Sequence, residues 1–236
     1  MGDSITFSHA TPILVEKMNF TAITANWIFL SKALWITFSI SALSMVLGFL
    51  IGVFVGGFRT YGGRFLDVIL GFYVDTMRSV PLLVVLLWVY FAFPLIIGRS
   101  IDVYVAAVVG LGVQLGAYMA ETIRAGLTSV RQGQMSAALA LGMSRVDAVR
   151  TIILPQALIR MLPSLGSLFV SIIKDSAIAS VIAVPELLRQ TQIIAGKTYQ
   201  PFILYTAAML VYFSLCFPVA RGIDMIYRRY SHLGSS

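Results

Sequence analysis

Long apolar stretches separated by short polar ones dominate the sequence. The stretch 33–58 carries no charged residue over 26 positions and is bounded by Lys32 and Arg59. At about 1.5 Å of rise per helical residue, it is long enough to cross roughly 30 Å of hydrocarbon. The other apolar runs cover 65–97, 103–120, a segment that starts at about 156, and 198–220. The pattern predicts an all-α, polytopic helical membrane protein with about five transmembrane helices.

The composition supports a membrane protein and limits its chemistry. Of the 236 residues, 58% are hydrophobic and 11% are charged, whereas about 25% of the residues of a soluble domain are charged. The basic residues behind the net charge of +7 are scattered between apolar runs, which fits membrane topology better than nucleic-acid binding. The sequence has no Walker-type Gly-Lys-Ser/Thr loop, no His cluster and a single cysteine. We therefore expect a chain that is not an enzyme and that holds no metal or cofactor; if ATP drives this protein, another polypeptide binds the ATP and its Mg²⁺.

Ionisable and polar side chains in the second and third apolar runs are candidates for a solute pathway. Asp75 and Arg78 are three positions apart, and Glu121 and Arg124, which follow Tyr118, repeat that spacing. Residues three apart share a helix face, so each acid can neutralise its base. Charges at membrane depth usually face the bundle interior or a watery cavity. The pair of Asp75 and Arg78 therefore either locks its span to its neighbours or borders a polar pathway. For Glu121 and Arg124, the alternative to a pathway role is a satisfied pair at the membrane boundary.

Lys174 and Asp175 interrupt the fourth apolar run. Adjacent helical residues diverge by about 100°, so the two charges cannot face the same partner, and at least one should point into the bundle interior. We expect both residues and Glu121 around the solute pathway, with a buried salt bridge as the structural alternative. The segment 176–200 indicates a re-entrant or extracellular-side hairpin before the last span.

Glycines recur every four residues in the first span, at Gly48, Gly52 and Gly56. This spacing places them on one helix face, where small residues allow a close approach between helices. We expect this seam to pack within the subunit rather than to form a dimer interface.

The stretch 133–163 is a long amphipathic segment between the apolar runs. Residues 134–141 form a predicted Ala-rich helix, Gly142 supplies a flexible break, and Ser144 with Asp147 has the spacing of a capping box at a helix start. Small residues let another backbone approach closely, while arginines keep the surface out of the hydrocarbon. We expect a cytoplasmic docking surface for a large partner.

At these residues the sequence resembles the signature loop, or EAA loop, of inner-membrane permeases of binding-protein-dependent ABC importers. The family pattern has Glu-Ala-Ala, a Gly a few residues later and Ile-x-Leu-Pro, and this chain has Ala137, Ala138, Gly142, Ile152, Ile153, Leu154 and Pro155. Ser136 stands where the pattern has Glu. The resemblance implies that a loop at about 127–155 couples the chain to a cytoplasmic ATPase through Gly133, Ser136, Ala137, Ala138, Gly142, Ser144, Leu154 and Pro155.

Further blocks at 75–84, 106–127 and 171–188 resemble the polar amino acid uptake branch of that family. The resemblance implies a type I ABC importer transmembrane domain that takes a polar amino acid from an extracytoplasmic binding protein into the cytoplasm. The implied partners are ATPase subunits, the binding protein and a second permease. Serine lacks the carboxylate that Glu offers to a basic group of the ATPase. We therefore favour a heterodimer with a sister permease that carries Glu over a homodimer.

Positive charges near the ends of the apolar runs indicate the orientation. With five spans and a cytoplasmic carboxyl end, ten of these Lys and Arg residues lie inside and five lie outside. This predicts a multi-pass protein with its amino terminus outside, and the resemblance implies that the membrane is the bacterial inner membrane. The chain divides into a lead (1–32) that is extracytoplasmic or interfacial, a transmembrane domain (33–229) and a tail (230–236). The lead lacks the pattern of a cleavable signal peptide.

Two other functions fit part of the pattern. A secondary transporter driven by an ion gradient would use carboxylates such as Glu121 and Asp175, although no internal repeat is visible. A non-transporting scaffold would use the loop to anchor a soluble protein, although its intramembrane charges would then have no use. The particular amino acid is left open.

Overall fold

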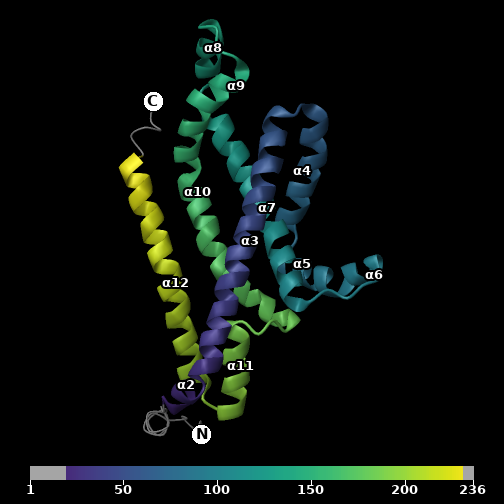
Figure 1. The fold of residues 1–236 in the computed structure, drawn as a ribbon, viewed down its shortest axis with the longest axis vertical. Coiled ribbons are helices and arrows are strands. Elements are labelled where there is room, and N and C mark those ends of the chain that lie inside the picture. Colours follow the sequence, from purple (N-terminus) through teal and green to yellow (C-terminus); the bar gives the residue numbers. More distant parts are fainter. Residues whose placement is uncertain (1–19, 231–236) are drawn as a thin grey trace, which may run out of the picture.

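The computed structural model describes residues 20–230, and all regular elements in that range are helical. Long helices run alongside one another in a slender bundle (Figure 1). In chain order the α-helices are α2 (Thr21–Ala25), α3 (Trp27–Tyr61), α4 (Arg64–Ser79), α5 (Leu82–Leu87), α6 (Phe93–Ile97), α7 (Val103–Ser129), α8 (Gln132–Ala140), α9 (Arg145–Ala148), α10 (Leu154–Asp175), α11 (Leu187–Thr198) and α12 (Pro201–Tyr230). Two π-helical segments, η2 (Trp88–Ala92) and η3 (Val149–Ile153), and one 3-10 helix, η4 (Ser176–Ile182), lie between them.

Within the described residues, four helical segments are long and apolar enough to cross a membrane, and a bent helix pair makes up to five spans. The prediction of about five spans is therefore confirmed, with one of them broken. The helices α8 and α9 project beyond one end of the bundle, on the side that also holds the turn between α3 and α4 (Figure 1). The helices α2 and α11 lie at the opposite end.

The second span, expected over about 65–97, is bent by 106° between α4 and the helical segment that starts at Leu82. Pro81 has no N–H to donate and disfavours a helical conformation at the residue before it. Val80 is accordingly extended, with φ −90° and ψ 133°. Buried Gln114 of α7 satisfies the carbonyls that the break exposes, because its amide donates to Met77 O at 3.0 Å and to Val80 O at 2.7 Å. The break is thus a supported feature of the interior.

The helices α3 and α7 form the central pair of the bundle. Gly48, Gly52 and Gly56 are buried on the face of α3 that meets α7. At Gly52 the approach is so close that an added Cβ would lie 2.5 Å from Met119 Cβ. The prediction that this glycine seam packs within the subunit is confirmed.

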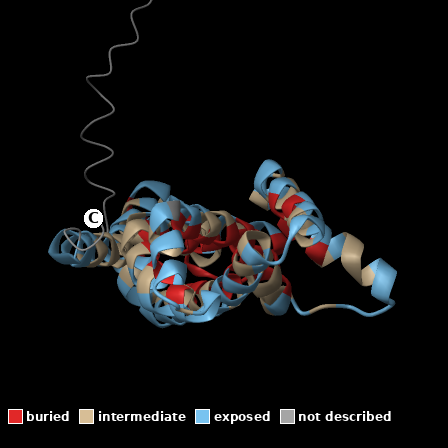
Figure 2. Ribbon diagram, turned by 90° about the horizontal axis from the view of Figure 1, so that it is seen from above, coloured by how far each residue is buried: buried red, intermediate tan, exposed pale blue. Residues whose placement is uncertain are grey.

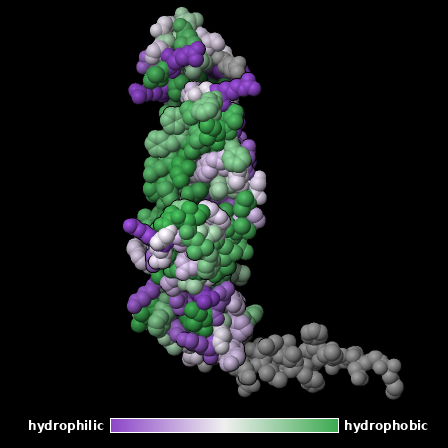
Figure 3. Space-filling view, turned by 90° about the vertical axis from the view of Figure 1, so that its right-hand side faces the viewer, coloured by the Kyte–Doolittle hydropathy of each residue, from purple (hydrophilic) through white to green (hydrophobic). Residues whose placement is uncertain are grey.

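The surface of the bundle is apolar along much of its length. Buried residues lie where the helices face one another (Figure 2). On the face drawn in Figure 3, hydrophobic side chains cover the middle, whereas hydrophilic ones gather toward the two ends. Large apolar side chains such as Trp35 of α3 and Phe202 of α12 are 68% exposed, which is expected of residues that face lipid or another subunit.

The predicted docking stretch forms α8, a turn and α9, and its first half is as expected. The helix predicted over 134–141 is α8, and Gly142 follows with φ +82° in the left-handed region that favours glycine. Ser144 caps α9, because its Oγ accepts the N–H of Asp147 at 3.2 Å. The capping prediction is confirmed.

The second half of this stretch differs from the prediction, because the helix of the fourth span starts before residue 156. Helix α9 continues through η3 into α10 and ends at Asp175, with no break near residue 156. Pro155 lies just after the π-helical segment η3, a local adjustment that lets a continuous helix accommodate a residue without an N–H. Pro163 lies inside α10. The helical segment that contains the fourth span therefore begins within the docking stretch, at Arg145.

Candidate functional site

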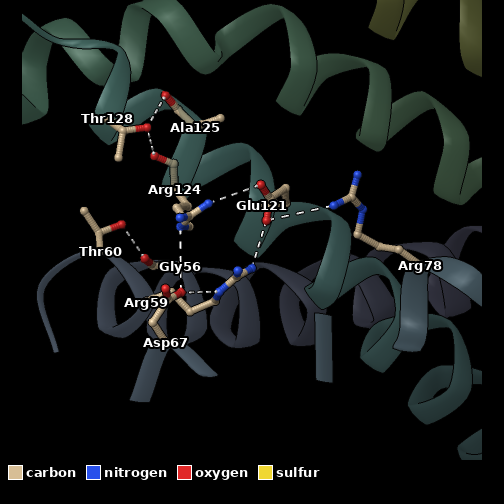
Figure 4. Close-up of polar contacts among 9 residues, drawn as sticks. All are labelled: Gly56, Arg59, Thr60, Asp67, Arg78, Glu121, Arg124, Ala125 and Thr128. Carbon is tan, nitrogen blue, oxygen red and sulfur yellow. Dashed lines mark hydrogen bonds and ion pairs between the residues drawn. The ribbon is translucent and has the colours of Figure 1, made fainter. Parts of the chain in front are cut away.

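Three helices are joined by a network of ion pairs near the end that carries α8 and α9 (Figure 4). Arg59 of α3 donates to Glu121 of α7 at 2.8 Å and to Asp67 of α4 at 3.1 Å. Arg124, one turn after Glu121, lies 3.6 Å from Glu121 and 3.9 Å from Asp67. Arg78, at the end of α4, lies 3.9 Å from Glu121. The network thus holds two carboxylates among three guanidinium groups.

The two acid–base pairs expected from sequence have different outcomes. The pair between Glu121 and Arg124 is present, as the spacing predicted. The pair between Asp75 and Arg78 is wrong: among the described residues Asp75 makes no ion pair, and Arg78 turns to Glu121 instead. Arg78 lies in the last turn of α4, next to the break, where its side chain can reach across to α7.

A cavity of about 450 Å³, here called the central cavity, lies between the α4–α5 break, α7 and α10. The polar residues that line it include Arg78, Gln114, Tyr118, Ser171 and Asp175. Its size falls within the roughly 300–1,000 Å³ of small-molecule sites, which are mostly apolar with a few placed polar groups. The structure therefore brings three of the predicted pathway residues, Arg78, Tyr118 and Asp175, to one cavity.

A second cavity of about 350 Å³, here called the loop-side cavity, is lined by Arg78, Tyr118, Glu121, Ser129 and Arg160, among others. Arg160 of α10 donates a hydrogen bond to the carbonyl of Ser129, the last residue of α7 before the loop. Glu121 thus lines this cavity and also belongs to the ion-pair network.

Lys174 lies apart from these two cavities. It lines two smaller cavities beside α12, one with Asp224 and the other with Tyr205 and Tyr212. Its neighbour Asp175 lines the central cavity. The two adjacent charges therefore face different surroundings, as their helical spacing predicted, and Asp175 is the one that shares a cavity with Arg78.

The residues predicted to contact an ATPase are divided between the surface and the interior of the loop. Seven of them are exposed: Gly133, Ser136, Ala137, Gly142, Ser144, Leu154 and Pro155. Ala138 is 1% exposed, so its side chain shapes the packing of the loop instead of its surface. Gln156 of α10 donates to Gln134 of α8 at 2.6 Å and so fixes α8 against the span.

Sequence reasoning missed a buried carboxylate at the opposite end of the bundle. Glu186 is fully buried and caps α11, accepting the N–H of Leu188 at 2.8 Å and of Arg189 at 2.6 Å. It also accepts the hydroxyl of Tyr212 from α12 at 3.0 Å. Burial raises the pKa of the Glu186 carboxyl above its usual range, although these hydrogen bonds act in the opposite direction. An acidic residue just before an amphipathic segment was the available signal for this cap.

Comparisons with known proteins agree on one family. The family model described as "Binding-protein-dependent transport system inner membrane component" matches residues 48–232. The chain is 36% identical over 201 residues to "Probable amino-acid ABC transporter permease protein YckA" of Bacillus subtilis, covering 85% of this chain and 88% of that one. It is 34% identical over 221 residues to "Glutamine transport system permease protein GlnP" of Escherichia coli, covering 93% of this chain and 94% of that one.

A solved structure described as "Crystal structure of an amino acid ABC transporter with histidines" has a similar fold. Its chain superposes with a TM-score of 0.83 at 32% identity, covering 90% of this chain and 99% of that one.

The bundle of spans, the projecting helical loop and the polar cavities define a multi-pass membrane permease. The extent of the match then fixes its family: the chain belongs to the binding-protein-dependent transport system inner membrane components, and it is a permease subunit of an ABC importer of the inner membrane. The expectation of such a permease is confirmed. The comparisons favour neither a secondary transporter nor a scaffold.

Proposed function

We propose that this permease carries a polar amino acid from an extracytoplasmic binding protein into the cytoplasm, driven by a separate ATPase that docks on α8 and α9. The observation that carries the proposal is the projecting loop, which stands beyond the spans at one end (Figure 1). Leu141 at its tip is 84% exposed and Val146 is 57% exposed. Exposed apolar side chains at the end of a membrane bundle are suited to a protein partner.

The choice of a polar amino acid rests on the relatives and on the cavities. The similar proteins are named for amino-acid or glutamine transport. An α-amino acid carries an ammonium and a carboxylate, and the central cavity is lined by the oppositely charged Asp175 and Arg78. Tyr118 and Glu121 continue the polar lining toward the loop. Asp75 and Lys174 remain candidates for the pathway in the assembled importer.

The chain itself is proposed to catalyse no covalent change and to bind no cofactor. ATP and Mg²⁺ would be bound and hydrolysed on the ATPase subunits, whose closure would move the spans through α8 and α9. The excess of positive residues on the loop side supports a cytoplasmic loop and an extracytoplasmic amino terminus.

Co-purification with the ATPase tests the proposal. A complex that hydrolyses ATP faster when a binding protein loaded with glutamine, arginine or glutamate is added supports it, and the most effective amino acid identifies the substrate class. Gly142→Trp is expected to release the ATPase, whereas Gly142→Ala imposes the same backbone strain without the bulk. If Gly142→Trp retains the ATPase as well as Gly142→Ala does, the docking surface lies elsewhere.

We further propose that the permease pairs with a sister permease that carries Glu at the position of Ser136. A carboxylate that faces an Arg or Lys gives a stronger, charge-assisted hydrogen bond than a neutral hydroxyl does. Expression of this chain with the ATPase alone is the test. A fully active complex with two copies of this chain would contradict the heterodimer, whereas tighter association of Ser136→Glu would support the missing contact.

A further inference from the structure

The two cavities are stacked along the bundle, and they meet at two residues. Along α7 the central cavity is lined at 111–118 and the loop-side cavity at 118–129. Along α10 the corresponding residues lie at 168–175 and at 160–164. Both helices therefore place the loop-side cavity nearer to α8. Arg78 and Tyr118 line both cavities.

Arg78 and Tyr118 also contact each other where the cavities meet. The Tyr118 hydroxyl donates to the Arg78 carbonyl at 3.3 Å. The Arg78 guanidinium lies over the Tyr118 ring, with its carbon 5.8 Å from the ring centroid. A cation at this distance from an aromatic face is attracted to it. The two side chains thus form one contact that stands between the two cavities.

The ion-pair network holds Glu121 firmly but holds Arg78 only loosely. Glu121 is held at 2.8 Å by Arg59, whose side chain is 9% exposed, whereas it lies 3.9 Å from Arg78, whose side chain is 40% exposed. Arg124 is a further partner of Glu121 at 3.6 Å. If Arg78 leaves Glu121, that carboxylate keeps two cationic partners. Arg78 is therefore the member of the network that can move at the lowest cost (Figure 4).

We propose that Arg78 and Tyr118 are the gating residues of this subunit, and that they separate the central cavity from the loop-side cavity until Arg78 swings away. A fixed frame receives Arg78 in the closed position, and its members are Arg59, Asp67, Glu121 and Arg124. The inference deepens the proposed function, because it assigns the two cavities to successive sections of the solute pathway.

The test measures leakage without ATP in proteoliposomes that contain the whole importer. The vesicles are loaded with radiolabelled mannitol, a neutral solute that needs no recognition by the transporter, and efflux is followed in the absence of nucleotide. Removal of the gate by Arg78→Ala or Tyr118→Ala is expected to raise mannitol efflux about tenfold. A factor of ten corresponds to about 1.4 kcal/mol, roughly what one exposed cation–π contact and one exposed ion pair contribute together.

Two further variants distinguish a gate from a loss of packing. Thr76→Ala changes a residue of α4 two positions before Arg78 that belongs neither to the ion-pair network nor to the lining of either cavity, so its efflux should stay at the wild-type level. Tyr118→Phe retains the ring beneath Arg78 and should leak little. Wild-type efflux in both Arg78→Ala and Tyr118→Ala, in complexes that elute intact from a sizing column, would overturn the proposal. Equal leakage in Thr76→Ala would also overturn it. Because mannitol is not the substrate, a wrong assignment of the amino acid would leave this result unchanged.

Discussion

Substitution of a single glycine in α3 provides a sharp test of the central helix pair. In Gly52→Ala, the added Cβ would lie 2.5 Å from Met119 Cβ and 3.2 Å from Ala120 N, and both atoms are fixed to the backbone of α7. Neither can move away without shifting the helix, and overpacking of this kind typically costs about 1–3 kcal/mol. For chains of 150–250 residues, each kcal/mol shifts Tm by about 2–4 °C. We therefore expect Tm to fall by several degrees.

The matched control lies five residues further along the same helix. An added Cβ at Gly57 meets no atom within 4 Å, and alanine is favoured over glycine inside a helix by roughly 1 kcal/mol. Gly57→Ala should therefore leave Tm unchanged or raise it slightly. Thermal unfolding of the purified permease in one detergent, followed by the tryptophan fluorescence, compares the two variants. Equal Tm values for Gly52→Ala and Gly57→Ala would refute the close α3–α7 contact.

Two other predictions concern buried polar groups. Gln114→Leu removes the donor to the carbonyls of Met77 and Val80. Because an unsatisfied buried acceptor costs about 1–3 kcal/mol, the variant should unfold at a lower temperature than the wild type. An unchanged Tm would show that the break between α4 and α5 does not need Gln114. Burial raises the pKa of the Glu186 carboxyl, so the folded protein binds a proton at Glu186 more tightly than the unfolded protein does. The contribution of Glu186 to the free energy of unfolding therefore falls as pH rises from the ordinary Glu pKa of about 4.3 through the raised pKa of the folded state. Glu186→Gln should remove that part of the decline, and an identical pH profile of Tm in the variant and the wild type would contradict it.

Local patterns were sufficient for the spans and for the loop. A run of apolar residues long enough to cross the hydrocarbon is itself the physical requirement for a spanning helix. The helices α3 and α7 accordingly contain their predicted runs, and α12 contains the run predicted over 198–220 from Pro201 onward. The turn at Gly142 and the cap at Ser144 were also predictable, because both depend on residues close in the chain. The same holds for the ion pair between Glu121 and Arg124, which are one turn apart.

Contacts between distant segments explain what the sequence could not predict. Arg59 and Glu121 are 62 positions apart, and nothing local marks them as partners. Arg78 lies near Glu121 because α4 packs against α7, and the carbonyls at the break are satisfied by Gln114, which lies 34 and 37 positions away from its two acceptors. The burial of Ala138 was hidden for the same reason, since it depends on how the loop packs as a whole.

Transport by the reconstituted importer tests the central claim most directly. Proteoliposomes that contain this permease, its partner permease and the ATPase would be supplied with ATP on the ATPase side and with a binding protein loaded with radiolabelled amino acid on the other side. We predict uptake that requires ATP, that continues when ionophores collapse the ion gradients, and that is lost in Gly142→Trp. Uptake that continues without ATP and stops with the ionophores would contradict it.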